Sequence, residues 1–167
     1  MNMTNQSISK TTQYLAWILL IGVGMGISVS VISSFFVIGV GKIADLRTEF
    51  LIGSFEMFGN EYSLDAVFWL LVAAILLSLT RFLFNLQRWH GPADSIYAAH
   101  RTDNELDMRG GFGSTLASFV SLGAGAPVGQ YGPLVHFGAT LGSFINSIIK
   151  YQKITIDTFI GCGVAAA

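Results

Sequence analysis

The chain has 167 residues, of which 52% are hydrophobic and only 11% are charged, and its mean hydropathy is +0.60. Soluble domains usually carry about 25% charged residues, so this composition excludes an ordinary soluble fold. The formal net charge of -1 offers no basic surface for nucleic acid. The single cysteine, Cys162, excludes an internal disulfide framework and a cysteine-based zinc site.

Three long stretches contain no Asp, Glu, Lys or Arg: residues 11–41, 66–80 and 110–149. A helix needs about 20 apolar residues to cross the hydrocarbon core of a membrane. The sequence therefore predicts an all-α integral membrane protein that crosses the bilayer several times. We expect residues 1–13 to form a cytoplasmic N-terminal segment and residues 14–167 to belong to the transmembrane domain.

The first apolar run, Tyr14 to Val40, predicts a helix about 40 Å long. It exceeds the hydrocarbon core of about 30 Å, so we expect the helix to be strongly tilted or to extend beyond the membrane. Gly22 and Gly26 lie four residues apart on it. They permit the close approach of another helix, although a plain span with incidental glycines is an equal alternative.

A polar loop is expected from Lys42 to Asp65, followed by a second span at Ala66–Leu79 that Phe82–Phe84 extend. Basic residues gather beyond this span, in the segment from 81 to 109. The positive-inside rule then places the N-terminus and this basic segment in the cytoplasm and the 42–65 loop outside, with the cell (inner) membrane as the location. The basic residues concerned are Arg81, Arg88, Arg101 and Arg109.

Glycine and proline become frequent from Gly110 to Gly142, where Pro127 and Pro133 interrupt the apolar sequence. At membrane depth, this pattern is typical of broken helices whose irregular backbone lines a cavity enclosed by protein. Pro133 suits a first helical position, because the missing N–H is no loss there. We therefore expect a helix from Pro133 to about Ile149.

The start of that helix is a candidate anion site. Its first N–H groups lack helical acceptors and carry the positive end of the helix dipole, so they can bind a small anion without a buried cation. No Lys or Arg occurs between Arg109 and Lys150, which fits binding by partial charges. No cofactor and no metal site is expected, because no two histidines are spaced at i, i+4.

Gly129-Gln130-Tyr131-Gly132-Pro133 resembles the G-[K/R]-E-G-P signature of the CLC family of chloride channels and chloride/proton antiporters. Upstream, the segment 90–96 is similar in place to the family's first anion-site motif, G-S-G-I-P, with Gly91 on its second glycine and His90 on its serine. Downstream, Thr158–Ala167 resembles the small-residue helix that follows the second motif. The resemblance spans Tyr14 to Ala167.

The resemblance implies a fold of two inverted repeats of membrane helices, of which this chain supplies only the first part. We expect the sequence to continue past Ala167, because its last apolar helix has no terminating signal. The resemblance also implies chloride or a similar anion as the ligand, a lipid membrane as the surroundings and a homodimer of the complete protein. The implied anion-binding and gating residues are His90, Gly91 and the run 129–133.

Tyr131 occupies the position of the family's gating glutamate. Because a phenol ordinarily has a pKa near 10, it cannot shuttle protons near neutral pH as a carboxylate does. We therefore predict anion conduction without glutamate-based proton coupling, the rival being a tyrosine that blocks the path or favours another anion. His90 either donates to the anion or acts as an interfacial or capping residue.

An alternative in the same broad class is a chloride/proton antiporter with a different relay. Alternatives from other classes are an intramembrane enzyme and a non-transporting membrane subunit. An enzyme is not favoured, because the Gly-rich span contains His136 and scattered serines but no acid. We expect His136 to pack or to bridge helices, and His100 to be solvated. Gly138 and Gly142 predict close packing of another helix.

Overall fold

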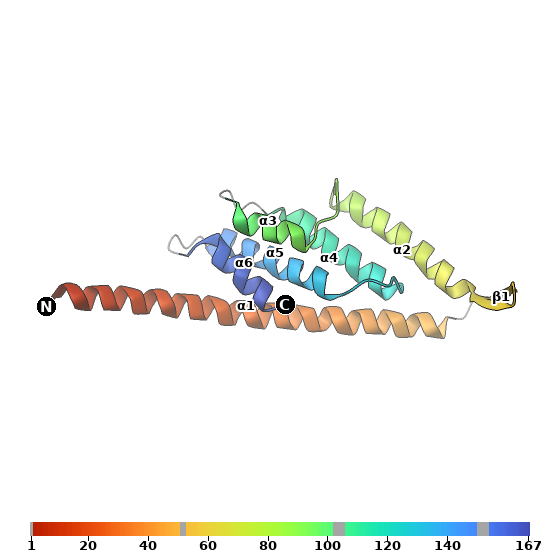
Figure 1. Ribbon diagram of the computed structural model, residues 1–167, viewed down its shortest axis with the longest axis horizontal. Coiled ribbons are helices and arrows are strands. Elements are labelled where there is room, and N and C mark those ends of the chain that lie inside the picture. The colour runs from red at the N-terminus through yellow and green to blue at the C-terminus, as the bar shows by residue number, and fades with distance from the viewer. Residues whose placement is uncertain (1, 51–52, 102–105, 150–153) are drawn as a thin grey trace.

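The computed structural model describes residues 2–50, 53–101, 106–149 and 154–167. Helices dominate these residues, as predicted, and one short β-hairpin joins the first two helices (Figure 1). In chain order the elements are α1 (Asn2–Glu49), β1 (Ser54–Met57), β2 (Asn60–Ser63), α2 (Leu64–Leu83), α3 (Pro92–His100), α4 (Met108–Gly123), α5 (Tyr131–Ile149) and α6 (Ile156–Ala165).

Helix α1 is longer than the apolar run that predicts it. It continues without a break through residue 13 and past Val40 to Glu49, so the expected loop from Lys42 is wrong in its first part. Residues 42–49 include good helix formers, and Arg47 Nη1 donates a hydrogen bond to Ala124 O of the turn after α4, at 3.1 Å. The pattern of apolar residues along the sequence cannot predict this tertiary contact.

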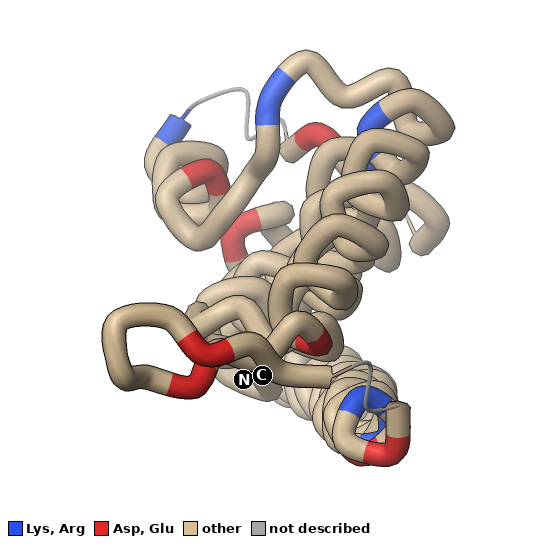
Figure 2. Tube along the Cα trace, turned by 90° about the vertical axis from the view of Figure 1, so that its right-hand side faces the viewer, with Lys and Arg blue, Asp and Glu red and all other residues tan. Residues whose placement is uncertain are grey.

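Helices α1 and α2 are long and apolar enough to cross a membrane, over Thr11–Glu49 and Leu64–Leu83 respectively. The second matches the predicted span closely. The charged residues of α2 lie only at its two ends, with Asp65 in the first turn and Arg81 in the last (Figure 2). Most of the apolar surface of both helices is open, which suits a lipid environment.

The shorter helices pack on one side of the middle of α1 (Figure 1). Ile21, Met25 and Val29 of α1 form a buried cluster with Ile154 and Phe159, which ties α1 to α6. A second buried cluster joins α3, α5 and α6 through Ala98, Ala139 and Ile160. Small side chains at these crossings let the helix backbones come close, as membrane helix packing requires.

Glycines bring α5 and α6 into direct backbone contact, as Gly138 and Gly142 predict. A Cβ added to Gly138 would overlap the carbonyl oxygen of Gly163, and one added to Gly142 would overlap the carbonyl oxygen of Phe159. Gly22 and Gly26 differ, because a Cβ at either would meet no atom within 4 Å among the described residues. Gly22 and Gly26 therefore mediate no close helix contact with the described residues, which agrees with the alternative that they are incidental.

We expect Gly142→Ala to destabilise the protein by about 1–3 kcal/mol, because the new methyl group must push the α6 backbone away from α5. Gly161→Ala is the matched control, since a Cβ at that position of α6 meets nothing within 4 Å. Thermal unfolding of the purified protein in detergent measures both. Equal midpoints for the two variants would contradict the close contact.

Candidate functional site

The backbone is interrupted between α4 and α5, where the sequence predicts broken helices. Helix α4 ends at Gly123, and no helix is formed again until Tyr131. Gly125 turns the chain with φ of 96°, a left-handed conformation that glycine adopts without steric cost. Arg47 donates to the preceding carbonyl, Ala124 O, and so places a cation at the negative end of the α4 dipole.

Helix α5 begins at Tyr131, two residues before the predicted start at Pro133. Pro133 is therefore the third helical residue, where a backbone N–H would still have no helical acceptor. The four backbone N–H groups of residues 129–132 donate to no acceptor among the described residues, whereas Leu134 N already donates to Gln130 O at 3.3 Å. A row of unsatisfied donors thus runs from the two residues before α5 into its first turn.

The electrostatics of this helix start differ from those of its neighbours. Of α2 to α6, three helices carry an aspartate in their first turn: Asp65, Asp94 and Asp157. Helix α4 is preceded by Asp107, whose carboxylate accepts from Arg109 N at 3.0 Å. Helix α5 has no acidic residue in its first turn, so its dipole is not offset by a carboxylate of its own.

The first and second motif segments converge in space, although 38 residues separate Pro92 from Gln130 in sequence. A Cβ built on Gly132 would lie 3.5 Å from Pro92 Cγ at the start of α3. A pocket of about 400 Å³ lies between them, and His90, Gly129 and Pro133 line it together. Hydroxyls of α4 complete its polar lining: Ser114, Ser118 and Ser121.

The backbone N–H of Gly91 at the start of α3 is hydrogen-bonded within the protein. Gly91 N donates to Asp94 Oδ2 at 2.8 Å, and Asp94 also forms an ion pair with Arg88. In this conformation the Gly91 amide is therefore engaged by the protein's own carboxylate. The assignment of Gly91 to an anion site stays a prediction.

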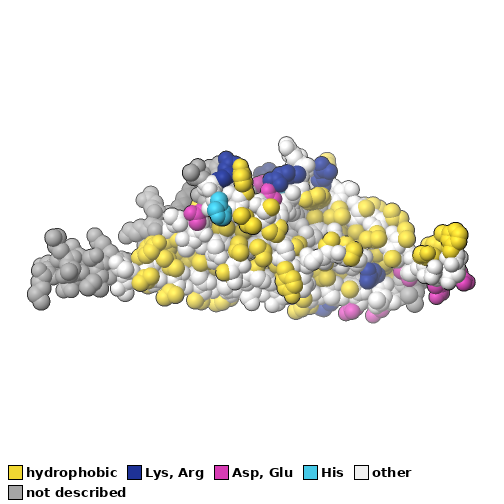
Figure 3. Space-filling model, in the orientation of Figure 1, with side chains coloured by type: hydrophobic (Ala, Val, Ile, Leu, Met, Phe, Trp, Pro, Cys, Tyr) yellow, Lys and Arg dark blue, Asp and Glu magenta, His cyan; other side chains and the backbone are white. Residues whose placement is uncertain are grey.

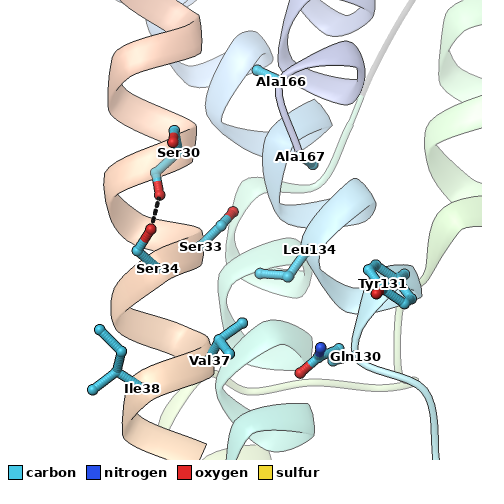
Figure 4. A pocket seen from close by; sticks show the side chains of 10 residues that line it. All are labelled: Ser30, Ser33, Ser34, Val37, Ile38, Gln130, Tyr131, Leu134, Ala166 and Ala167. Carbon is cyan, nitrogen blue, oxygen red and sulfur yellow. Dashed lines mark hydrogen bonds between the residues drawn. The ribbon is translucent and has the colours of Figure 1, made fainter.

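Gln130 and Tyr131 lie on the opposite side of the segment. They line a groove of about 480 Å³ between α1, the start of α5 and the end of α6 (Figure 4). Three serines of α1 face this groove: Ser30, Ser33 and Ser34. Ser34 Oγ donates to Ser30 O, whereas Ser33 Oγ is buried with no partner among the described residues. The Tyr131 side chain is 73% exposed.

His90, which is partly buried, and His136, which is fully buried, form a stacked pair that the sequence did not predict. Their rings stack in parallel with centroids 6.4 Å apart, and Ser95 Oγ hydrogen-bonds His136 Nδ1 at 2.7 Å. His136 is thus a polar bridge between α5 and α3, as expected, while its Nε2 has no partner in the described part of the chain. The two histidines are 46 residues apart in the sequence, and no local pattern indicates that their rings stack.

The His90 ring packs against α4. A Cβ on Gly110 would overlap it, and its Nε2 lies 3.8 Å from Asp107 Oδ2. The His90 backbone N–H donates to Ser114 Oγ at 2.7 Å. These contacts favour an interfacial role for His90, and its direct donation to an anion stays a prediction. His100 is exposed and bonds Ile96 O within its own helix.

These features define a helical membrane protein whose third long apolar stretch is broken where uncompensated amides cluster. A family model described as voltage gated chloride channel matches residues 71–167, which is more than half of the chain. The chain belongs to this family, the CLC chloride channels and transporters, as the motifs predict. The family comprises membrane transport proteins and not enzymes. Searches of curated proteins and of solved structures each returned no match.

We expect Ser95→Ala to destabilise the protein by about 1–3 kcal/mol, because it leaves both ring nitrogens of His136 buried without partners. His136 is only 1% exposed, so water cannot replace the lost bond without repacking. Ser78→Ala is the control, since that exposed hydroxyl bonds only a carbonyl of its own helix. Thermal unfolding in detergent measures the difference, and unfolding midpoints that agree would argue against the bridge.

Proposed function

We propose that this protein provides a passive pathway for chloride, with the anion held by backbone amides at the start of α5 and no glutamate-based proton coupling. The observation that carries the proposal is the run of four backbone N–H groups at residues 129–132 that donate to no described residue, at the start of a helix without an acidic first turn. An anion there gains several N–H donors and the helix dipole at once. Partial charges also let it leave, which conduction requires.

Membership of the chloride channel family supports chloride as the ion. Anion binding requires no cofactor, and chloride itself is the ligand. Gly129 and Pro133 face one pocket and Gln130 and Tyr131 face another groove, so the segment that carries the free amides separates two solvent-accessible hollows. An ion that crosses between them would pass the amides.

Tyr131 is the gate in this proposal. Its ring is one of the side chains that line the groove beside α1 (Figure 4), and in the proposal it narrows access to the amides without supplying a carboxylate that could carry a proton. An antiporter with another relay is the alternative, and the stacked His90–His136 pair lies beside the segment as a group of titratable side chains. Proton measurements distinguish the two.

The proposal includes an orientation and an assembly. Basic residues after α2 and acidic residues around the hairpin support an orientation with the N-terminus in the cytoplasm and the hairpin outside the cell (inner) membrane. The complete protein is proposed to be a homodimer.

We expect Tyr131→Ala to raise chloride efflux from liposomes about tenfold, which corresponds to about 1.4 kcal/mol of barrier removed with the ring. Tyr97→Ala is the control, because Tyr97 is exposed and lines neither hollow. The complete protein is used, and efflux is followed with a chloride electrode. Unchanged efflux in Tyr131→Ala would show that the ring does not narrow the path.

Proton coupling is measured in the same liposomes. With a chloride gradient imposed, the wild-type protein should move no protons against their gradient, because no carboxylate stands at position 131. Stoichiometric uphill proton movement would instead establish the antiporter. If neither chloride nor protons move, the transport assignment itself is rejected.

A further inference from the structure

The β-hairpin between α1 and α2 has two chemically different faces. Its register pairs Phe55 with Tyr62 and Met57 with Asn60, whereas Glu56 pairs with Glu61 and Ser54 with Ser63. Because side chains alternate across a strand, aromatic and apolar groups occupy one face and carboxylates and hydroxyls the other. Figure 3 shows hydrophobic side chains on one side of this hairpin and acidic side chains on the opposite side.

The aromatic face is organised but uncovered. The rings of Phe55 and Tyr62 stack with centroids 5.6 Å apart, and all residues of both strands are exposed to solvent. An isolated two-stranded hairpin is only marginally stable in water. An apolar environment against the aromatic face would stabilise it.

The hairpin turn places an aromatic ring in an unfavourable position. Phe58 has φ of 54° and Gly59 has φ of 74°, angles for which a two-residue turn prefers Asn, Asp or Gly at both positions. A bulky residue is sterically disfavoured at such angles, and the Phe58 side chain is also 89% exposed. A turn that is surrounded by water therefore offers no physical advantage for a phenylalanine at this position.

The surroundings of the hairpin identify its partner. It joins the two helices that can cross a membrane, and aromatic rings continue from it along their ends: Phe50 contacts Trp69, which contacts Phe68. Aromatic side chains gather at the level of lipid headgroups. The opposed carboxylates of Glu56 and Glu61 repel each other and must stay in water, so only one orientation of the hairpin suits the interface.

We propose that this hairpin is a lipid anchor: Phe55, Met57, Phe58 and Tyr62 enter the headgroup region of the bilayer, and the Glu56–Glu61 face remains in water. The anchor also acts on α1, which is 48 residues and about 72 Å long and must tilt in, or extend beyond, a membrane core of about 30 Å. Helix tilt is fixed by interfacial anchors, and the hairpin holds the end of α1 at one level. The inference does not depend on how the protein handles anions.

The test compares neighbouring residues on opposite faces. In a Cys162→Ala background, Phe55→Cys, Phe58→Cys and Glu56→Cys are each labelled with an environment-sensitive fluorophore, and the complete protein is reconstituted in phosphatidylcholine vesicles. Labels at 55 and 58 should emit at shorter wavelength and lose most of their fluorescence to lipids brominated near the headgroup. The label at 56 should respond instead to aqueous iodide.

Equal bromolipid quenching at 55 and 56 would overturn the proposal. So would protection of position 55 from both quenchers, which is the result expected if a second copy of the chain covers the face. Phe58→Asn provides a separate readout, because asparagine suits the turn better than phenylalanine. A purely structural tip would tolerate that change, whereas an anchor should lose bromolipid quenching at a label on position 55.

Discussion

The unpaired amides of residues 129–132 exist because α4 and α5 are two helices and not one. A continuous helix would use those donors for its own hydrogen bonds and would present only side chains. The left-handed turn at Gly125 and the Arg47 bond to Ala124 hold the interruption in place. Everything proposed for chloride follows from donors that the backbone cannot satisfy itself.

The position of the α5 start is fixed by close packing along the rest of that helix. Gly138 and Gly142 bring it onto α6, and Gly132 brings it against Pro92 of α3. Buried side chains reinforce the arrangement, because His136 bonds Ser95 of α3 and stacks on His90. The body of α5 is therefore held by close packing, while its N-terminal end remains open.

Charge is distributed so that this opening stays electropositive. The starts of α3 and α4 are satisfied by Asp94 and Asp107, and the carboxylate of Asp94 is itself paired with Arg88. These helix dipoles are largely used within the protein. Helix α5 has no acidic residue in its first turn, and no described Lys or Arg lines either hollow beside it. The proposed anion would therefore be attracted by partial charges without being trapped by a full one.

The sequence by itself determined the membrane class, the second span, the break before Pro133 and the family. Composition and the Gly129–Pro133 motif are local signals whose physical meaning does not depend on neighbours. Only the tertiary structure decided that α1 extends to Glu49, that α5 starts at Tyr131, and that His90 stacks on His136. Each of these depends on contacts between residues far apart in the chain, which local periodicity does not encode.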